Sequence, residues 1–301
     1  MPDATIYQTM NKFLGLNNVE DPTRLPPTVV NREYVHSLQQ ASNVEIDNSY
    51  GLKSRPGYAT ALAGTDIHSL WSDNETCLFV DETTLYQLML DYSVVSLQAN
   101  LAHAARMSYA PVNDRVYLTN GTQIGYVKSL AYAALVDPEM EFKCPMPAGQ
   151  LIEYYRGCLY VAVKNVLYIS DPLCDYYDTR TGYRIFAADI RLLRAVDDGL
   201  YVGDDKVWWV GGAANEDFDR TEAYAFSPIL YTDIRTDGQH VGDGVKGKIA
   251  MWTSENGVCI GGNDGTVVNV TEARFAFDPH GRGSGVIRET GNVRHYINTL
   301  Y

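Results

Sequence analysis

The sequence lacks the long apolar run that a membrane-spanning helix needs. No stretch reaches roughly 18 consecutive apolar residues, and residues 1–18 lack the basic start and apolar core of a secretory signal. Basic residues are also scarce, because 24 Lys and Arg against 37 Asp and Glu give a formal charge of −13. A field of that sign repels phosphate backbones. We therefore expect a protein made in a cytoplasm, without a membrane anchor and without sequence-specific nucleic-acid binding.

Cysteine is sparse and unpatterned. There are five cysteines and no CxxC pair, and four of the five lie in or beside apolar, strand-like runs. This pattern favours buried free thiols over disulfides or a metal site. The five are Cys77, Cys144, Cys158, Cys174 and Cys259.

The familiar catalytic and cofactor motifs are missing too. The six histidines form no HxH, HExxH or HxxxH spacing, and there is no GxSxG elbow, no phosphate-binding GxxxxGK[ST] loop and no GxGxxG opening a helix. Asn215–Asp219 begins like a calcium loop, but Arg220 stands where that loop needs glycine. We therefore expect no enzymatic activity, no metal and no cofactor.

What the sequence does contain is an internal repeat. A short apolar and aromatic run, a tight polar turn and a second apolar pair recur five times, which is the signature of a β-hairpin. Equivalent positions in the five copies are Val80, Leu118, Val161, Val202 and Ile260. The first three intervals between them fit the roughly 40 residues of a four-stranded propeller blade. The last interval is clearly longer and indicates a loop excursion near residues 215–246.

Two further hairpins flank the repeats. Residues 43–47 with 51–58 form one, and residues 286–289 with 293–297 form the other. A closed ring joins its first and last blades, so we expect N- and C-terminal strands to pair in one shared blade. The sequence thus predicts an all-β propeller of about six four-stranded blades, with five to seven possible, spanning residues 43–301.

Residues 1–42 form an extended N-terminal arm in this interpretation. They carry four prolines but also too many apolar residues for a disordered tail, so we expect the arm to dock on its own ring or on a neighbour. The predicted partner-binding residues are Ile6, Tyr7, Met10, Phe13, Leu14, Leu16 and Val19.

Carboxylates leave an enzymatic alternative open, because propeller glycosidases place Asp and Glu from different blades around the central channel. Most candidates fall at turn tips, where Asp is common for local hydrogen-bonding reasons. They are Asp81, Glu82, Asp171, Asp175, Asp178, Asp197, Asp198, Asp204 and Asp205.

The start of the chain resembles tailed-bacteriophage virion proteins of the head-to-tail gene block. The matching pieces are Phe13–Val19 (FLGLNNV), Asp21-Pro22 with Arg24-Leu25-Pro26, Ala41–Asp47 (ASNVEID), and Gly51-Leu52 with Arg55–Tyr58 (RPGY). The resemblance by motif ends at Tyr58, and the repeats beyond it are similar only in style.

This resemblance implies a structural β-propeller subunit of a tail hub, nozzle or neck. Such a subunit assembles in the bacterial host cytoplasm and resides in the virion. Its implied partners are further copies in a homo-oligomeric ring, the portal, the adaptor, and tail fibre or needle proteins. Genomic DNA would pass without sequence-specific binding, and the acidic charge would suit such a conduit if the acids line a lumen.

A second alternative is a receptor- or glycan-binding propeller at the tail tip, with exposed Trp and Tyr stacking on sugars. Trp208 and Trp209 are adjacent in one predicted strand, so their side chains point to opposite faces. We expect both to pack between blades.

Overall fold

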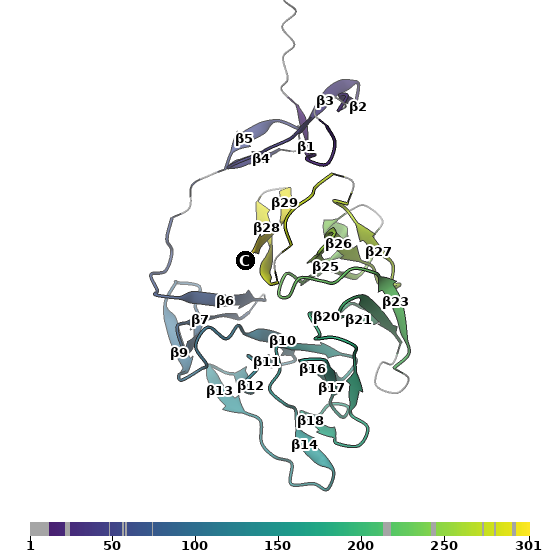
Figure 1. Cartoon of the computed structure of the whole chain (residues 1–301). Helices are drawn as coiled ribbons and strands as arrows, with labels where there is room; N and C mark the ends of the chain where they lie inside the picture. The colour runs from purple at the N-terminus through teal and green to yellow at the C-terminus, as the bar shows by residue number, and fades with distance from the viewer. Residues whose placement is uncertain are drawn as a thin grey trace, which may run out of the picture.

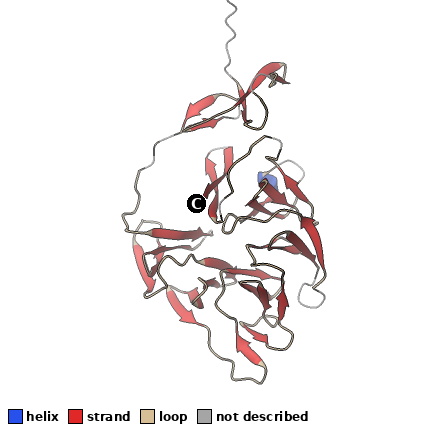
Figure 2. Cartoon of the chain, in the orientation of Figure 1, coloured by secondary structure: helices blue, strands red, loops and turns tan. Residues whose placement is uncertain are grey.

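The computed structural model describes residues 12–21, 25–47, 49–55, 57, 59–73, 75–212, 218–241, 245–272, 274–279, 281–290 and 293–301. This part of the chain contains 29 strands, β1–β29, and one short 3₁₀ helix, η2 (Gly238–His240). Figure 2 shows how completely strands dominate. None of the described helical segments is long and apolar enough to cross a membrane.

Five four-stranded antiparallel sheets follow one another along the chain and form the first five blades of a ring (Figure 1). Blade 1 comprises β6 (Ile67–Ser72), β7 (Cys77–Asp81), β8 (Thr84–Leu88) and β9 (Val94–Gln98). Blade 2 comprises β10 (Ser108–Val112), β11 (Arg115–Thr119), β12 (Ile124–Lys128) and β13 (Ala131–Ala134). Blade 3 comprises β15 (Leu151–Tyr155), β16 (Cys158–Val163), β17 (Val166–Ile169) and β19 (Tyr183–Ile185). Blade 4 comprises β20 (Leu192–Ala195), β21 (Gly199–Gly203), β22 (Val207–Gly211) and β23 (Arg220–Tyr224). Blade 5 comprises β24 (Ile234–Asp237), β25 (Lys248–Ser254), β26 (Gly257–Gly261) and β27 (Val267–Asn269).

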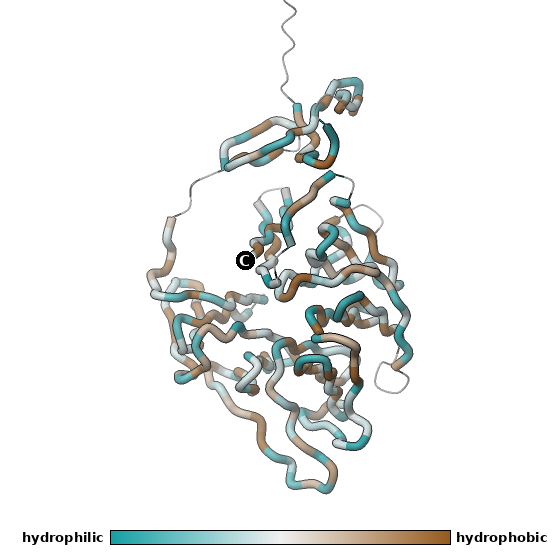
Figure 3. The backbone as a smooth tube through the Cα atoms, viewed as in Figure 1, coloured by the Kyte–Doolittle hydropathy of each residue, from teal (hydrophilic) through white to brown (hydrophobic). Residues whose placement is uncertain are grey.

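The hydrophobic core lies between neighbouring blades. Separate clusters join blades 1 and 2, blades 2 and 3, blades 3 and 4, and blades 4 and 5. Apolar residues therefore occur on both faces of the inner strands, and Figure 3 shows brown, hydrophobic segments along the blades. The expected β-propeller fold is confirmed.

In the described residues, the sixth position of the ring holds a hairpin, β28 (Gly283–Thr290) and β29 (Val293–Leu300), which forms a two-stranded sheet. It packs on blade 5, where the Tyr296 hydroxyl donates to the Thr232 carbonyl oxygen at 2.7 Å. No ladder in the described residues joins this hairpin to an N-terminal strand. The expected shared sheet is therefore absent there, because the N-terminal strands pair among themselves.

Those N-terminal strands form a small unit outside the ring (Figure 1). β3 (Glu33–Leu38) pairs in parallel with β1 (Phe13–Leu16) and antiparallel with β2 (Thr28–Val30). The predicted hairpin beside them is β4 (Val44–Ile46) with β5 (Leu52–Ser54). The Phe13 amide donates to the Tyr50 carbonyl oxygen at 2.7 Å and fastens this hairpin to β1. We call β1–β5 the N-terminal unit; it extends beyond the expected boundary at residue 42.

The prediction of a loop excursion near residues 215–246 is wrong for much of that range. β23 (Arg220–Tyr224) is the fourth strand of blade 4, and β24 (Ile234–Asp237) is the first strand of blade 5. Both look like loops in the sequence because they are polar, and β23 is largely exposed. Matching the fifth repeat on Ile260 therefore compares the third strand of blade 5, β26, with the second strands of the other blades. The second strand of blade 5 is β25, so Trp252 is the better equivalent of Val202 and the interval between blades becomes shorter.

A genuine excursion leaves blade 3 instead. β14 (Lys143–Pro145) pairs with β18 (Tyr176–Asp178) in a small separate sheet that projects from the ring (Figure 1). Lys143 Nζ lies 2.5 Å from Asp171 Oδ2 and 3.2 Å from Asp178 Oδ2. The pair with Asp178 joins β14 to β18, and the pair with Asp171, which follows β17, links the excursion to blade 3.

Candidate functional site in the central channel

A cavity of about 420 Å³ lies at the centre of the ring. Residues of six strands line it, namely β6, β10, β15, β20, β24 and β28. These are the first strands of the five blades and of the terminal hairpin. The cavity is therefore the central channel of a six-position propeller.

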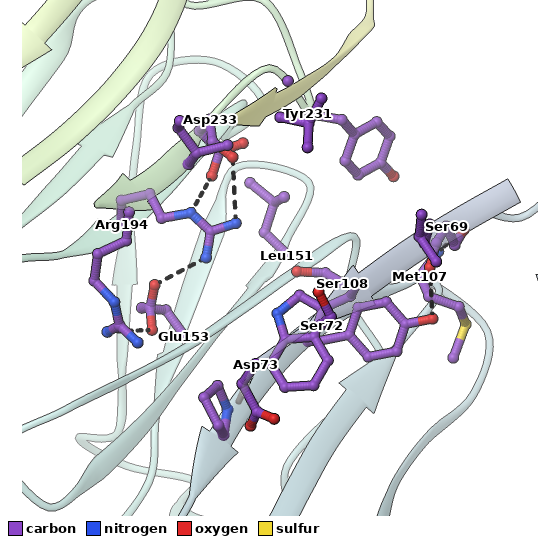
Figure 4. Close-up of a pocket in the computed structure, with 18 of the residues that line it drawn as sticks. Ser69, Ser72, Asp73, Met107, Ser108, Leu151, Glu153, Arg194, Tyr231 and Asp233 are labelled. Atoms are coloured by element: carbon purple, nitrogen blue, oxygen red, sulfur yellow. Dashed lines mark hydrogen bonds and ion pairs between the residues drawn. The ribbon is translucent and has the colours of Figure 1, made fainter. Parts of the chain in front are cut away.

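Three charged side chains from blades 3, 4 and 5 meet in the channel wall (Figure 4). Arg194 on β20 places its Nε 2.7 Å from Asp233 Oδ2 and its Nη1 3.1 Å from Glu153 Oε2. Nη1 of Arg235, on β24, lies 3.7 Å from Glu153 Oε1. We call Glu153, Arg194 and Asp233 the channel clasp, since each side chain comes from a different blade or its entry segment.

The clasp is deeply buried. The side chains of Glu153 and Asp233 are 2% and 3% exposed. Burial raises the pKa of Asp233, and the charge of Arg194 opposes that shift. For Arg194, burial lowers the pKa, but the carboxylates of Asp233 and Glu153 outweigh burial and hold it above its ordinary value. Arg194 therefore stays charged, and both buried carboxyl groups face a permanent cation.

Arg106, which precedes β10, also lines the channel. Its Nη1 donates to the Gly283 carbonyl oxygen at 2.6 Å and its Nη2 to Ser284 Oγ at 2.9 Å. Its guanidinium also lies 4.8 Å from the ring centroid of Tyr231. Arg106 thus ties blade 2 to the terminal hairpin.

Hydrogen bonds also fix the contact between blades 1 and 2. Ser69 Oγ accepts from the Met107 amide at 2.9 Å, and the Tyr109 hydroxyl donates to the Ser69 carbonyl oxygen at 2.9 Å. The Tyr109 ring stacks on Trp71 with 5.5 Å between centroids. Burial raises the pKa of Tyr109 well above its ordinary value, so this phenol remains a hydrogen-bond donor.

Charges in the channel balance. Asp73, Glu153 and Asp233 face three arginines among the lining residues. The excess of acid in the whole sequence is therefore not concentrated in this lumen. A conduit lined by acids, which the net charge suggested, does not describe the propeller's own channel.

The sequence-predicted acids are dispersed among turns. Asp81 Oδ1 accepts from the amides of Thr65 and Asp66, and Asp204 Oδ1 accepts from Trp208 Nε1 at 2.9 Å. Within the described ranges no group of three or more His, Cys, Asp or Glu could hold a metal ion. The nine acids therefore do not converge on one site.

The predicted partner-binding residues fall in the N-terminal unit or before it. Phe13, Leu14 and Leu16 lie on β1 and are half-buried, and Val19 is 51% exposed. Ile6, Tyr7 and Met10 lie outside the described residues. Their role as contacts with other chains stays a prediction.

The two adjacent tryptophans pack on opposite faces of β22. Trp208 contacts the core between blades 3 and 4, while Trp209 contacts the core between blades 4 and 5. The ring of Trp209 lies 4.8 Å from that of Tyr201. Both tryptophans are thus inter-blade packing residues, as expected.

All five cysteines are free, with Cys158 and Cys259 buried and the other three half-buried. Burial raises the pKa of Cys158 and of Cys259 to about 11. At neutral pH both are protonated thiols. The expectation of free rather than disulfide-bonded cysteines is confirmed, and the burial is complete for two of them.

Sequence reasoning missed the channel clasp. Its signal is a single charge inside an apolar strand, seen in LIEYY around Glu153 and in LLRAV around Arg194. A charge at such a position needs a partner, because burying it alone is costly. First strands of neighbouring blades supply that partner.

No protein-family model matches the chain, and no curated protein matches it. Among solved structures, it is similar to a gluconolactonase from Xanthomonas campestris, at 13% identity over 68% of this chain and 75% of that one, with a TM-score of 0.42. It is also similar to the WD40 β-propeller domain of Doa1, at 11% identity over 69% and 70%, with a TM-score of 0.44. A streptogramin B lyase is similar at 11% identity over 79% of this chain and 84% of that one, with a TM-score of 0.47. Likenesses at this level say nothing about the activity of this chain.

Proposed function

We propose that this chain is a structural virion protein of a tailed bacteriophage, a tail hub, nozzle or neck component. In this role it assembles below the portal and adaptor and helps to form or close the DNA channel. The proposal starts from the resemblance of residues 13–58 to virion proteins of the head-to-tail gene block. Its partners are further copies of itself, the portal, the adaptor, and tail fibre or needle proteins.

The observation that carries the proposal is the separate N-terminal unit. It has its own strand pairing and projects outside the ring (Figure 1). It also exposes apolar side chains, with Val29 at 60%, Tyr34 at 64% and Val19 at 51% exposure. Exposed aromatic and aliphatic residues on a projecting unit suit contact with another protein.

Few polar contacts join this unit to its own ring. Asn18 Nδ2 donates to the Ala276 carbonyl oxygen at 2.8 Å, and the Ala276 amide donates to Asn18 Oδ1 at 2.8 Å. Arg288 Nη2 lies 2.5 Å from Glu45 Oε1. A unit held by such contacts leaves much of its surface available to other subunits.

The channel clasp supports a structural role over polysaccharide processing. A glycosidase needs one carboxylic acid that can donate a proton and a second carboxylate that acts as a base or nucleophile. Glu153 and Asp233 are instead both bound by Arg194. Such pairing fixes strands relative to one another and engages the carboxyl oxygens that catalysis would need to be free.

The test is the composition of purified virions. In the phage that encodes this chain, mass spectrometry should find it in particles, and a gold-labelled tag should place it at the tail or neck. Deleting the gene should give heads that package DNA but fail to retain it or to acquire tails. Absence of the chain from purified particles would refute the proposal.

A further inference from the structure

The terminal hairpin is half a blade. In blades 1 to 5 the second strand is buried, with three or more buried residues in each of β7, β11, β16, β21 and β25. Residues 294–300 of β29 occupy the corresponding position, and none of them is buried. Among the described residues, no third or fourth strand pairs with this sheet to cover it.

The register of the hairpin shows which backbone groups lack partners. Thr290 pairs with Val293, so alternate residues of β29 bond to β28. The amides and carbonyls of Arg294, Tyr296, Asn298 and Leu300 therefore point away from β28. The Gly285 amide, opposite Asn298, likewise points away and donates to the Tyr231 carbonyl oxygen at 3.3 Å.

This outer edge of β29 has no strand beside it in the part of the chain that the structure describes. Among the described residues, no backbone hydrogen bond reaches the outward groups of residues 294, 296, 298 or 300. Other proteins protect such edges with short strands, bulges or covering elements, because an open edge pairs readily with another chain. An edge of this kind accepts an extended strand by main-chain hydrogen bonding.

We propose that the outer edge of β29 pairs with a strand from the N-terminal unit of a second copy of this chain, which completes the sixth blade between subunits. The inference deepens the proposed function and rests on its homo-oligomeric ring. The chemistry recognised is the main chain of an extended strand.

Charge favours a second copy as the partner. The hairpin and its flank carry Arg282, Arg288, Arg294 and His295 but only one acid, Glu289. Within the chain Arg294 pairs with Glu289 and Arg288 pairs with Glu45, and the hairpin with its flank remains net basic on a chain whose net charge is −13. A neighbouring copy offers acidic surface to it.

The N-terminal unit supplies the missing strands. Its hairpin β4–β5 provides two antiparallel strands, the number that the sixth blade lacks in the described residues. Glu45 and Asp47 of this hairpin form ion pairs with Arg55 and Lys53. Within one chain Glu45 already reaches Arg288 through side chains, yet β4–β5 remains a separate sheet. Exposed residues 59–61 and 63–66 connect the unit to β6 and leave room for exchange between copies.

The experiment uses the full chain and the pair Arg294→Pro and Arg294→Ala. Proline removes the outward amide of residue 294 without taking a hydrogen bond from the β28–β29 ladder. Alanine removes the same side chain but keeps the amide. Light scattering across a concentration series should show a defined oligomer for the unmodified chain and for Arg294→Ala. Arg294→Pro should raise the dissociation constant about tenfold, as expected for one lost interfacial hydrogen bond.

Hydrogen exchange gives a second readout that does not depend on a variant folding. In the oligomer, the amides of Arg294, Tyr296, Asn298 and Leu300 should exchange more slowly than in the diluted monomer. Equal exchange in both states, or equal assembly of the proline and alanine variants, would overturn the inference. A monomer at every concentration would overturn it as well.

The outcomes separate this inference from the proposed function. A chain that is monomeric in solution but present in virions would refute the pairing of copies and leave the virion role standing. A chain that forms the protected oligomer but is absent from virions would refute the virion role and support the pairing.

Discussion

At the scale of single residues, buried charges join the blades in the channel, whereas apolar packing joins them elsewhere in the ring. Arg194 bridges Glu153 and Asp233, whose side chains are almost fully buried. An ion pair of this kind adds little stability when compared with a well-packed apolar core, but removing one partner leaves an uncompensated charge. The clasp therefore fixes the relative positions of blades 3, 4 and 5.

Replacing Arg194 tests this directly. Arg194→Met leaves Asp233 buried without its ion-pair partner and Glu153 with only Arg235, at 3.7 Å, so the free energy of unfolding should fall by about 3 to 5 kcal/mol. Lys128→Met is the matched control, because Lys128 and its partner Asp114 are 44% and 64% exposed. Loss of that exposed pair should cost less than about 1 kcal/mol. Urea denaturation measures both, and similar losses in the two variants would show that the clasp is not needed for stability.

Asp178 should confer a dependence of stability on pH. Arg180, through its side chain and its amide, holds the pKa of Asp178 well below its ordinary value, and Lys143 adds to the effect. The folded state therefore binds fewer protons than the unfolded chain, so the stabilisation is present above the ordinary pKa of about 4 and is lost as pH falls below it. Asp178→Asn should lower the unfolding midpoint at pH 7, and the difference between the two proteins should begin to narrow as pH falls below about 4. Curves that stay parallel down to pH 3 would contradict this.

At the scale of elements, the second and third strands of a blade are packed so closely that some positions have no room for even a methyl group. Gly199 on β21 pairs with Gly211 on β22, and the Trp209 ring covers it. A Cβ at residue 199 would lie 2.2 Å from Trp209 Cη2. The strand can pack there only because glycine has no side chain.

Gly199→Ala should therefore destabilise the protein by about 1 to 3 kcal/mol through overpacking. Gly281→Ala is the matched control, since a Cβ at residue 281 meets nothing within 4 Å. Thermal unfolding followed by tryptophan fluorescence reports on both variants. Equal unfolding midpoints for Gly199→Ala and Gly281→Ala would contradict this prediction, because they would mean that Trp209 moves aside without a loss of stability.

The sequence predicted the second and third strands of the blades well and the fourth strands poorly, for one physical reason. Second and third strands are buried between blades, so their apolar runs stand out, as in residues 158–163. Fourth strands such as β23 are exposed and polar and therefore look like loops. The clasp was missed because Glu153 and Arg194 belong to different repeats and meet only when blades 3 and 4 stack.

At the scale of the whole molecule, the first strands of the five blades and β28 surround the channel. In the described residues, the sixth position of this ring lacks a third and a fourth strand. The terminal hairpin contributes an inner strand to the channel but, within the described residues, no third or fourth strand. The N-terminal unit lies outside the ring near this position and touches it through Asn18 and Glu45 (Figure 1). Ring and unit are thus two separately paired parts of one chain.

A chain that begins at Arg55 should keep the folded ring. It loses the bonds of Asn18 to Ala276 and the pair of Glu45 with Arg288, both at partly exposed sites, which cost little to break. We expect an unchanged far-ultraviolet circular dichroism spectrum, an unfolding midpoint within a few degrees of the full chain, and loss of incorporation into virions. Insolubility or loss of cooperative unfolding would show that the unit is part of the fold.

The position of Tyr301 at the sixth blade also limits how this protein can be labelled. Tyr301 follows β29 directly, and its hydroxyl accepts from Arg106 Nη1 at 3.1 Å. A purification tag added after Tyr301 would lie close to the outer edge of β29. A tag added before the N-terminal unit would be attached to the element that is proposed to pair with that edge. The loop ahead of β14, where Val136 is 79% exposed, projects from the far side of the ring (Figure 1). An epitope inserted there would report on assembly without obstructing it.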